Sequence, residues 1–306
     1  MRFGVKRTQD GEFAQPAALL ELVTAVHRLG YDSFWLGDHI TFPLTIDSSH
    51  GETGSWRTDP REDFLEAIAT AGFLLGSIAD LPIGIHALIA PYRNPVAAGK
   101  AIASLDHLSG GRMRFAVAAG WLEEVFPTLG APPFAQRGSV LEEYVDILRG
   151  MWRDGIASYD GQHYAIAPSR TLPRPYGGRH LPIFVGGRSV AAVRRAGRIG
   201  DGWAAARVAP ADASRLVSEF RCAAREAGKD VAQLEIIVEL DLATGPACSE
   251  TLSDTVAAYR SAGVTLLLLN PEAATVTAAI ADLERFSSGY GPRAQSNRAA
   301  PAAPAP

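Results

Sequence analysis

The sequence has little cysteine, no long hydrophobic run and no strong excess of either charge. Its two cysteines, Cys222 and Cys248, stand far apart and lack the spacing of metal ligands, so we expect neither a disulfide framework nor a metal site. Apolar runs such as Val264–Leu269 are far too short to span a bilayer. With 29 basic and 33 acidic residues, the net charge of −4 offers no attraction for nucleic acid or an anionic membrane surface. We therefore expect a cytoplasmic protein whose partner is a small molecule.

Several familiar catalytic motifs are also missing. The chain has no Gly-x-Ser-x-Gly elbow, no His-Glu-x-x-His pair and no P-loop, and no Gly-x-Gly-x-x-Gly follows its first apolar run. Each of these motifs fixes a nucleophile, a zinc ion or a phosphate at a defined turn or helix. Their absence argues against the corresponding hydrolases, zinc proteases and nucleotidases, and against a dinucleotide-binding open sheet.

What the sequence does contain is enough apolar material for one large core. Hydrophobic residues make up 47% of the 306 residues, and an α/β barrel forms a single domain of about 250 residues. We expect one barrel domain over residues 1–290. Residues 291–306 are rich in Ala and Pro and bury too little apolar surface to offset their ordering entropy, so we expect a disordered tail there.

Short apolar runs alternate with longer segments of helical periodicity along the whole domain. The runs predict eight strands: Phe3–Val5, Ser33–Gly37, Ile83–Leu88, Met113–Ala118, Ile183–Val185, Gly202–Ala205, Leu234–Leu240 and Thr265–Leu269. A helix is predicted after each strand, for example over Glu62–Ala79 and Ala273–Phe286. Strict alternation implies parallel strands with helical crossovers, and eight such units close into a (β/α)8 TIM barrel. An open doubly wound sheet is the alternative.

Two connections are unusually long. Residues 39–61 follow the second strand, which places them at the C-terminal mouth of the barrel, where barrel enzymes bind their ligands. Residues 155–182 form an insertion before the fifth strand. The segment Tyr159–Tyr164 inside this insertion predicts a small hairpin.

Polar side chains occur in or directly after two of the predicted strands. Asp38 and His39 follow the second strand, so His39 could act as a general base and Asp38 could orient a neighbour or bind a cofactor edge. Position alone also allows a capping role for Asp38 and a purely structural role for His39. His86 lies within the apolar third strand and needs a buried partner or a ligand, although a satisfied core histidine is the alternative.

Two glycine-containing turns complete the candidate site. In Gly120–Glu124, Gly120 permits close backbone approach and Trp121 could stack on a planar ring, while the two glutamates could equally be a solvated helix start. In Gly186–Ser189, exposed backbone N–H groups at a helix start suit a phosphate, with Arg188 as a further donor. An ordinary strand-to-helix turn is the alternative.

The chain resembles the bacterial luciferase-like superfamily, in particular the branch that uses the deazaflavin coenzyme F420. The matching stretches, in this order along the chain, are Gly30–His39, Pro91–Pro95, Leu105–Arg112, Gly120–Glu124, Pro182–Gly187 and Gly200–Trp203. The resemblance implies a flavin-like ring at the mouth of the barrel, near Asp38 and His39. It implies a non-prolyl cis peptide at His86–Ala87 behind the ring, a cofactor phosphate held by Gly186 and Gly187, and a homodimer.

The resemblance implies an oxidoreductase that transfers a hydride between F420 and a small organic substrate. A luciferase-like monooxygenase that uses FMN and molecular oxygen, and a barrel that binds a cofactor without catalysis, are the alternatives. Sugar-6-phosphate dehydrogenases of this family carry a glutamate where this chain has Trp121, and a tryptophan near Pro43 that is missing here. Their phosphate-binding lysines have no evident counterparts either. Apolar residues expected near the mouth (Trp35, Phe42, Trp56 and Trp121) instead predict a hydrophobic substrate.

Overall fold

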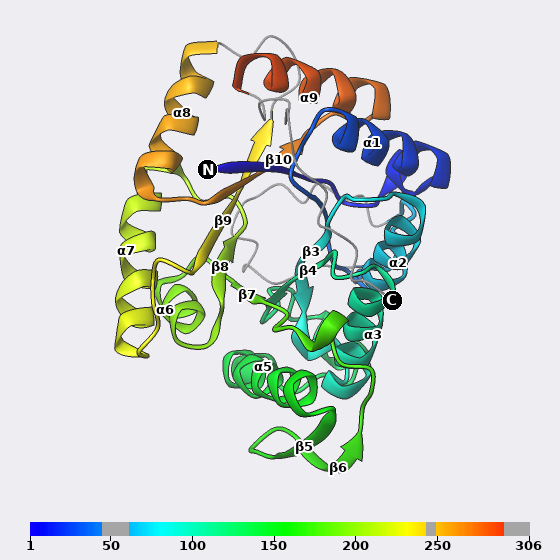
Figure 1. The fold of residues 1–306 in the computed structure, drawn as a ribbon, viewed down its shortest axis with the longest axis vertical. Helices are drawn as coiled ribbons and strands as arrows, with labels where there is room; N and C mark the ends of the chain where they lie inside the picture. Colours follow the sequence, from blue (N-terminus) through cyan, green and yellow to red (C-terminus); the bar gives the residue numbers. More distant parts are fainter. Residues whose placement is uncertain (45–60, 243–248, 291–306) are drawn as a thin grey trace, which may run out of the picture.

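The structure, a computed structural model, describes residues 1–44, 61–242 and 249–290, with side chains from 252 in the last range. The predicted tail at 291–306 and Trp56 lie outside these residues. Eight parallel strands close into a barrel in the order β1-β10-β9-β8-β7-β4-β3-β2, and the helices surround them (Figure 1). The strands are β1 (Arg2–Lys6), β2 (Phe34–Leu36), β3 (Ile83–Ile89), β4 (Met113–Ala118), β7 (Ile183–Gly186), β8 (Gly202–Ala205), β9 (Glu235–Leu242) and β10 (Leu266–Pro271). The predicted (β/α)8 barrel is confirmed.

A helix follows each barrel strand and packs its apolar face on the outside of the barrel. The eight helices are α1 (Pro16–Arg28), α2 (Ala67–Ser77), α3 (Pro95–Leu108), α5 (Arg137–Asp154), α6 (Val190–Ile199), α7 (Pro210–Glu226), α8 (Ser249–Ala262) and α9 (Val276–Tyr290). A short additional helix, α4 (Val125–Thr128), precedes α5. In the described parts of the chain, no helix combines the length and the apolar character needed to cross a membrane.

The start of α2 differs from the prediction. A helix from Glu62 was expected, but residues 62–65 run extended, because the backbone of this segment pairs with the loop after β1. The Leu65 N–H donates to the Gln9 carbonyl at 3.0 Å, and the Gly11 N–H donates to the Asp63 carbonyl at 3.1 Å. The helix begins only after Glu66, whose side chain caps it by accepting a bond from the Ala69 N–H.

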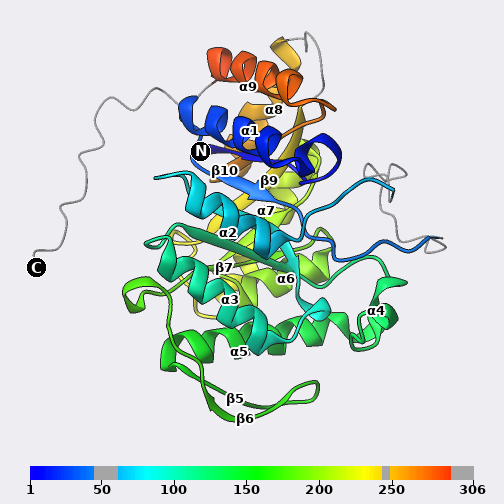
Figure 2. The same cartoon turned by 90° about the vertical axis from the view of Figure 1, so that its right-hand side faces the viewer.

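The insertion before the fifth barrel strand is an antiparallel hairpin of β5 (Ile156–Asp160) and β6 (Ala165–Arg170), which confirms the predicted hairpin. It lies on the outer side of α5 (Figure 2). Glu143 on α5 holds the hairpin turn, accepting bonds from the backbone N–H groups of Gln162, His163 and Tyr164 at 2.7, 2.9 and 3.1 Å. The insertion therefore packs away from the barrel interior.

The middle of the barrel is filled by apolar side chains from six strands. They are Trp35, Ala116, Phe184, Ala204, Ile237, Leu266 and Leu268. Trp35 is fully buried here, and its ring occupies the space beside Gly84, where an added Cβ would lie 2.2 Å from the ring. Its Nε1–H donates to Ser33 Oγ at 2.8 Å, toward the start of the strand. The expectation that Trp35 lines the mouth is therefore wrong.

Candidate functional site

Asp38, which follows β2, is held by three hydrogen bonds at the rim of the barrel. Its carboxylate accepts two bonds from the Arg93 guanidinium, both at 2.7 Å, and a third from the Ile89 N–H at 2.8 Å. Arg93 also donates to Glu66 at 2.7 Å. Asp38 thus ties the end of β2 to the end of β3 and leaves its charge paired. Its predicted contact with a cofactor stays a prediction.

His39 stands among aromatic side chains next to Asp38. Its ring centroid lies 4.9 Å from that of Phe42, 5.5 Å from Phe64 and 6.4 Å from Trp121. Burial, together with the positive charge of Lys6, lowers the pKa of His39 to about 4, while Asp10 opposes the shift. At neutral pH the ring is therefore uncharged and can accept a proton.

His86 and Ala87 form a bulge in β3 with a cis peptide bond between them, as predicted from the resemblance. The pairing of β3 with β4 shifts register between Ile85 and Leu88. The His86 ring is buried, packs edge-on against Trp35, and neither ring nitrogen reaches hydrogen-bond geometry with a described residue. Burial lowers the pKa of His86 to about 4, although nearby Glu239 and the Ala204 backbone favour protonation. The bulge leaves a neutral donor and acceptor at this depth of the barrel.

A buried ion pair that we did not predict lies beside His86. Lys6, the last residue of β1, donates to both carboxylate oxygens of Glu239 on β9, at 3.1 and 3.0 Å. The Glu239 side chain has no exposed surface, and the nearer His86 nitrogen, Nδ1, lies 3.7 Å from its Oε2. The only sequence signal was a charged residue inside each of two apolar strands. The pair joins residues 233 positions apart, so sequence spacing could not find it.

The network continues toward the strand ends on the same side of the barrel. Asn270 at the end of β10 donates to Glu239 at 3.1 Å and to Asp241 at 2.8 Å. Arg207, which follows β8 with a positive φ of 49°, pairs with Asp241 at 3.1 Å. Arg207 Nε also lies 3.9 Å from Glu239, so this guanidinium joins the same network. The mouth thus carries more charged groups than the sequence reasoning predicted.

The turn after β4 brings Gly120 and Trp121 to the rim. Gly120 has a φ of +89°, and an added Cβ would lie 3.0 Å from Ile89 and from Phe126, so no other residue fits without strain. Trp121 is half-buried beside His39, whereas Glu123 is exposed. The structure thus brings the Trp121 and His39 rings together.

The turn after β7 places the twin glycines at the start of α6. Gly187 has a φ of +129°, and an added Cβ would lie 2.4 Å from the Ala192 Cβ. Ser189 caps α6 by accepting a bond from the Ala192 N–H. The first N–H groups of a helix have no intrahelical partners, and at this turn they face the glycine segment. A hollow of about 420 Å³ adjoins the turn, lined by Arg188, Ser189, Arg207, Val208, Ala209, Asp212, Arg215 and Leu216. Positive charge and backbone donors together suit a phosphate.

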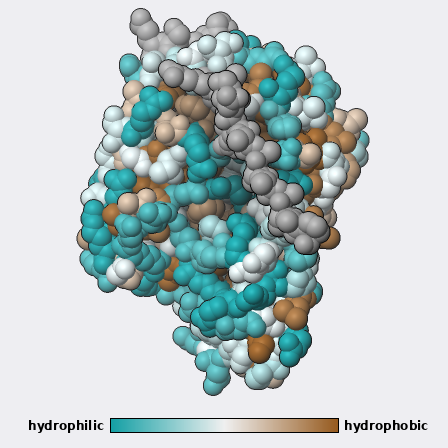
Figure 3. Space-filling view, in the orientation of Figure 1, coloured by the Kyte–Doolittle hydropathy of each residue, from teal (hydrophilic) through white to brown (hydrophobic). Residues whose placement is uncertain are grey.

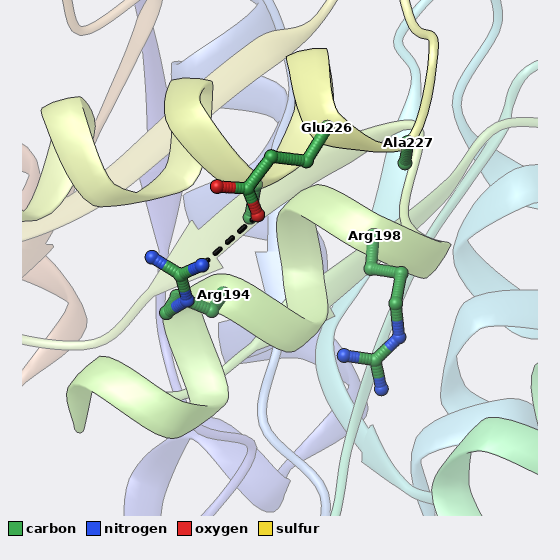
Figure 4. A pocket seen from close by; sticks show the side chains of 5 residues that line it. Arg194, Arg198, Glu226 and Ala227 are labelled. Carbon is green, nitrogen blue, oxygen red and sulfur yellow. Dashed lines mark hydrogen bonds and ion pairs between the residues drawn. The ribbon is translucent and has the colours of Figure 1, made fainter.

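The surface away from the rim offers little that competes with this site. A smaller hollow of about 150 Å³ lies between α6 and α7, where Arg194 pairs with Glu226 at 2.9 Å (Figure 4). Arg195 and Arg198 both pair with Glu142, so these three arginines form the polar helix face expected from the sequence. On the face in Figure 3, hydrophobic side chains form only small separate patches. Within the residues that the structure describes, no group of three or more potential metal ligands occurs.

Comparison with known proteins covers nearly the whole chain. The family model described as luciferase-like monooxygenase matches residues 1–304. A protein of Mycobacterium tuberculosis is 30% identical over 69% of this chain and 72% of its own length. An F420-dependent glucose-6-phosphate dehydrogenase of Segniliparus rotundus is 25% identical over 78% of this chain and 68% of its own length.

Two solved structures share the fold. An F420-dependent secondary alcohol dehydrogenase, solved in complex with an F420–acetone adduct, superposes with a TM-score of 0.77 at 20% identity, covering 93% of this chain and 97% of that one. The monooxygenase RslO1 from Streptomyces bottropensis gives 0.70 at 16% identity, covering 95% and 98%. Together with the family match, the barrel and its rim identify the chain as a member of the luciferase-like monooxygenase family.

Proposed function

We propose that this protein is an oxidoreductase that uses coenzyme F420 to transfer a hydride to or from a small hydrophobic substrate. The observation that carries the proposal is the meeting of three segments at one rim: the Asp38–His39 corner, the Gly120–Trp121 turn and the Gly186–Gly187 turn. Parallel strands deliver all three to the C-terminal ends of β2, β4 and β7. The F420-dependent relative and structural neighbour support the choice of coenzyme.

The residues at the rim fit a tricyclic coenzyme that carries a phosphate. The Gly187 turn is a cradle that a side chain would fill, since its Cβ would clash with Ala192. In the proposal, Gly186, Gly187 and Arg188 hold the phosphate, and His86 and Ala87 back the ring. Gly120 and Trp121 flank it. When bound, the coenzyme supplies or accepts the hydride, and the protein supplies orientation and shielding from water.

The acid–base roles follow from charge states. Neutral His39 can accept a hydrogen bond from a substrate hydroxyl and so orient it at the mouth. The Asp38 carboxylate accepts hydrogen bonds from Arg93 and Ile89, so we assign to it the positioning of the rim rather than proton transfer. Replacing Asp38 would therefore affect the reaction indirectly, by shifting the residues next to it.

The substrate we propose is apolar. His39, Phe42, Phe64 and Trp121 form an aromatic wall on one side of the mouth. Of the three lysines, Lys100 lies on α3 and Lys229 follows α7, where its Nζ donates to the Gly200 carbonyl. Only Lys6 stands at the rim, and Glu239 already pairs with it. Of the three lysines, a sugar phosphate at the mouth would therefore meet only one, and that one shares its charge with Glu239.

Titration of the purified protein with each oxidised coenzyme tests the proposal. Tight quenching of protein fluorescence by F420, with weak quenching by FMN, is the expected result. Gly186→Val should weaken F420 binding, because an added Cβ already lies 3.3 Å from Ala118 and from two carbonyl oxygens. Unchanged binding in that variant would count against the assigned phosphate site.

A luciferase-like monooxygenase that uses FMN and oxygen is the second candidate. The description of the family and the RslO1 neighbour favour it. Tight quenching by FMN but not by F420 in the same titration would reverse the order of the two candidates. We also propose a homodimer, on the strength of the family resemblance, and sedimentation equilibrium measures this directly.

A further inference from the structure

The Lys6–Glu239 pair is placed where neither packing nor strand pairing requires a charge. Both side chains lie on the interior face of the barrel, because Lys6 is in register with Trp35 and Glu239 with Leu268, and both of these belong to the apolar interior cluster. The Glu239 side chain is fully buried, and that of Lys6 is 11% exposed. Removing two charges from water is costly, and a hydrophobic pair of similar volume is often at least as stable. The pair is therefore better explained by chemistry at the mouth than by the stability of the fold.

Lys6 differs from the other cations at the rim in having one hydrogen-bond donor that its carboxylate partner does not use. Arg93 is divided between Asp38 and Glu66, and Arg207 is paired with Asp241. An ammonium has three donors, and Lys6 gives bonds to the two oxygens of Glu239. One N–H bond and the exposed part of the side chain remain for a ligand.

The groups around Lys6 form an acid–base set drawn from several strands. Glu239 on β9 is its counter-ion, and His86 on β3 lies beyond that carboxylate. His39, in the loop after β2, feels the charge of Lys6 and the opposite charge of Asp10 from the loop after β1. Arg207, Asp241 and Asn270 close the set toward β8 and β10. The charge of Lys6 acts on both histidines and lowers the pKa of each. A cationic donor and a neutral acceptor, Lys6 and His39, thus share one space.

We propose that Lys6 is a catalytic acid whose Nζ–H binds the carbonyl oxygen of a ketone or aldehyde with apolar substituents. This inference rests on the proposed function. F420 held at the rim would in its reduced form supply a hydride to the carbonyl carbon and release its second hydrogen to water as a proton. The C=O π electrons would move to oxygen, and that oxygen would take a proton from Nζ, which gives the alcohol. Neutral Lys6 would then take up from water the equivalent of the proton that the coenzyme released.

The same assignment explains two other features of the rim. Trp121 brings no acidic group to the rim, because an indole N–H is too weakly acidic to serve as a general acid. His39 is neutral and therefore cannot be the stronger acid. Glu239 is the positioning residue, because it holds the ammonium in place.

The first experiment needs no coenzyme. NMR titration follows the His39 ring in the wild type, in Lys6→Met with Glu239→Leu, and in the control Arg114→Met with Glu235→Leu at the other end of the barrel. Each double variant removes both charges of a pair and so leaves no buried ion alone. We expect the His39 midpoint to rise in the first variant and to stay unchanged in the control. An unchanged midpoint in the first variant would show that Lys6 does not face His39, and would overturn the inference.

The second experiment uses the protein loaded with F420 and a panel of apolar ketones, aldehydes and alcohols. General acids contribute about 10²- to 10⁴-fold, so the Lys6→Met, Glu239→Leu variant should bind F420 within threefold of the wild type while kcat falls at least about 100-fold. Lys6→Arg, which keeps the charge, should lie between them. Retained turnover in the double variant would refute the role of Lys6 and leave the proposed function intact. A wild type that does not bind F420 would refute both.

Glu239→Gln separates positioning from simple structural support. With one acceptor oxygen in place of two, Nζ is held less firmly, so kcat should fall while F420 binding stays within threefold of the wild type. A variant with a merely damaged fold would lose F420 binding as well. That combined loss would remove Glu239 from the account.

Discussion

The two ends of the barrel interior carry similar charges and use them differently. At the N-terminal end, Arg114 donates to Glu235 at 2.8 and 3.0 Å, and its guanidinium lies over Trp35 and Phe184 at 5.5 and 5.2 Å. At the mouth, Lys6 meets Glu239 without an aromatic partner. The Glu235 side chain is 27% exposed and that of Glu239 not at all. The lower pair packs against aromatic rings and is partly exposed to solvent, as is common for an ion pair with a structural role.

The difference in exposure shows which of the two ion pairs the stability of the fold can explain. A partly exposed pair gains and costs little, so the lower pair needs no further explanation. A fully desolvated pair is expensive to keep and more expensive to break. Its position at the mouth, beside two neutral histidines, is the reason we place the chemistry there.

Breaking the upper pair should have the largest effect. Glu239→Leu leaves the Lys6 ammonium buried without a partner, and removal of one partner of such a pair costs about 3–5 kcal/mol. Glu235→Leu at the other end should cost less, since Arg114 stays partly exposed and Arg2, the second partner of Glu235, keeps its pairing with Asp32. Urea unfolding of both variants measures the contrast. Equal losses would mean that the two ends do not differ.

Acidification should have the next largest effect, because it lowers the free energy of unfolding through His86 at the mouth. Burial lowers the pKa of His86 from 6.5 to about 4, so the folded protein takes up fewer protons than the unfolded chain between these values. Stability is therefore fully present above pH 6.5 and falls toward pH 4, by up to about 3 kcal/mol for this residue. In His86→Phe the unfolding free energy should decline less steeply over the same range. A slope identical to that of the wild type would contradict burial of a neutral His86.

Asp38→Asn should lower the free energy of unfolding somewhat less than acidification does. The change weakens charge-assisted bonds to Arg93 and Ile89, which are worth about 1.5–3 kcal/mol when a charged group takes part. The matched variant at the other end, Asp32→Asn, loses only a bond to a half-exposed Arg2 and should change stability by about 0.5 kcal/mol or less. Thermal unfolding measures both. A larger loss of stability in Asp32→Asn than in Asp38→Asn would contradict the role of Asp38 in tying the end of β2 to the end of β3.

Gly187→Ala should have a moderate effect on stability and a selective one on coenzyme binding. The added Cβ would lie 2.4 Å from Ala192 at a φ of +129°, a strain of about 1–3 kcal/mol. We expect at least tenfold weaker F420 binding. Gly110→Ala, at the opposite end, also has a positive φ but meets nothing within 4 Å. It should leave F420 binding unchanged, and a similar loss in both variants would sever the link between the Gly187 turn and the phosphate.

The fold was predictable from the sequence because its signals are local. Apolar runs and helical periodicity alternate strictly, and strand limits agree to within about two residues, as in Ile83–Leu88 predicted against Ile83–Ile89 observed. The start of α2 was not predictable, because residues 62–65 pair with the loop after β1. Trp35 was misplaced because its inward side chain could point toward either end of the barrel. Its bond to Ser33 shows that it points down.

The site was predictable only in part, for the same physical reason. Asp38, His39 and the glycine turns follow strands, so topology alone sends them to the rim. The partners of Lys6 and Glu239 are set by which strands meet across the barrel, and β1 reaches β9 only when the ring has closed. Arg93 as the partner of Asp38 was missed in the same way, 55 positions away.

A crystal structure of the protein with oxidised F420 would test the central claim most directly. The account predicts the tricyclic ring at the mouth, with the His86–Ala87 bulge behind it, Trp121 beside it and the phosphate on the Gly186–Ser189 turn. A coenzyme bound elsewhere on the surface, or a phosphate that does not touch the twin glycines, would contradict the account.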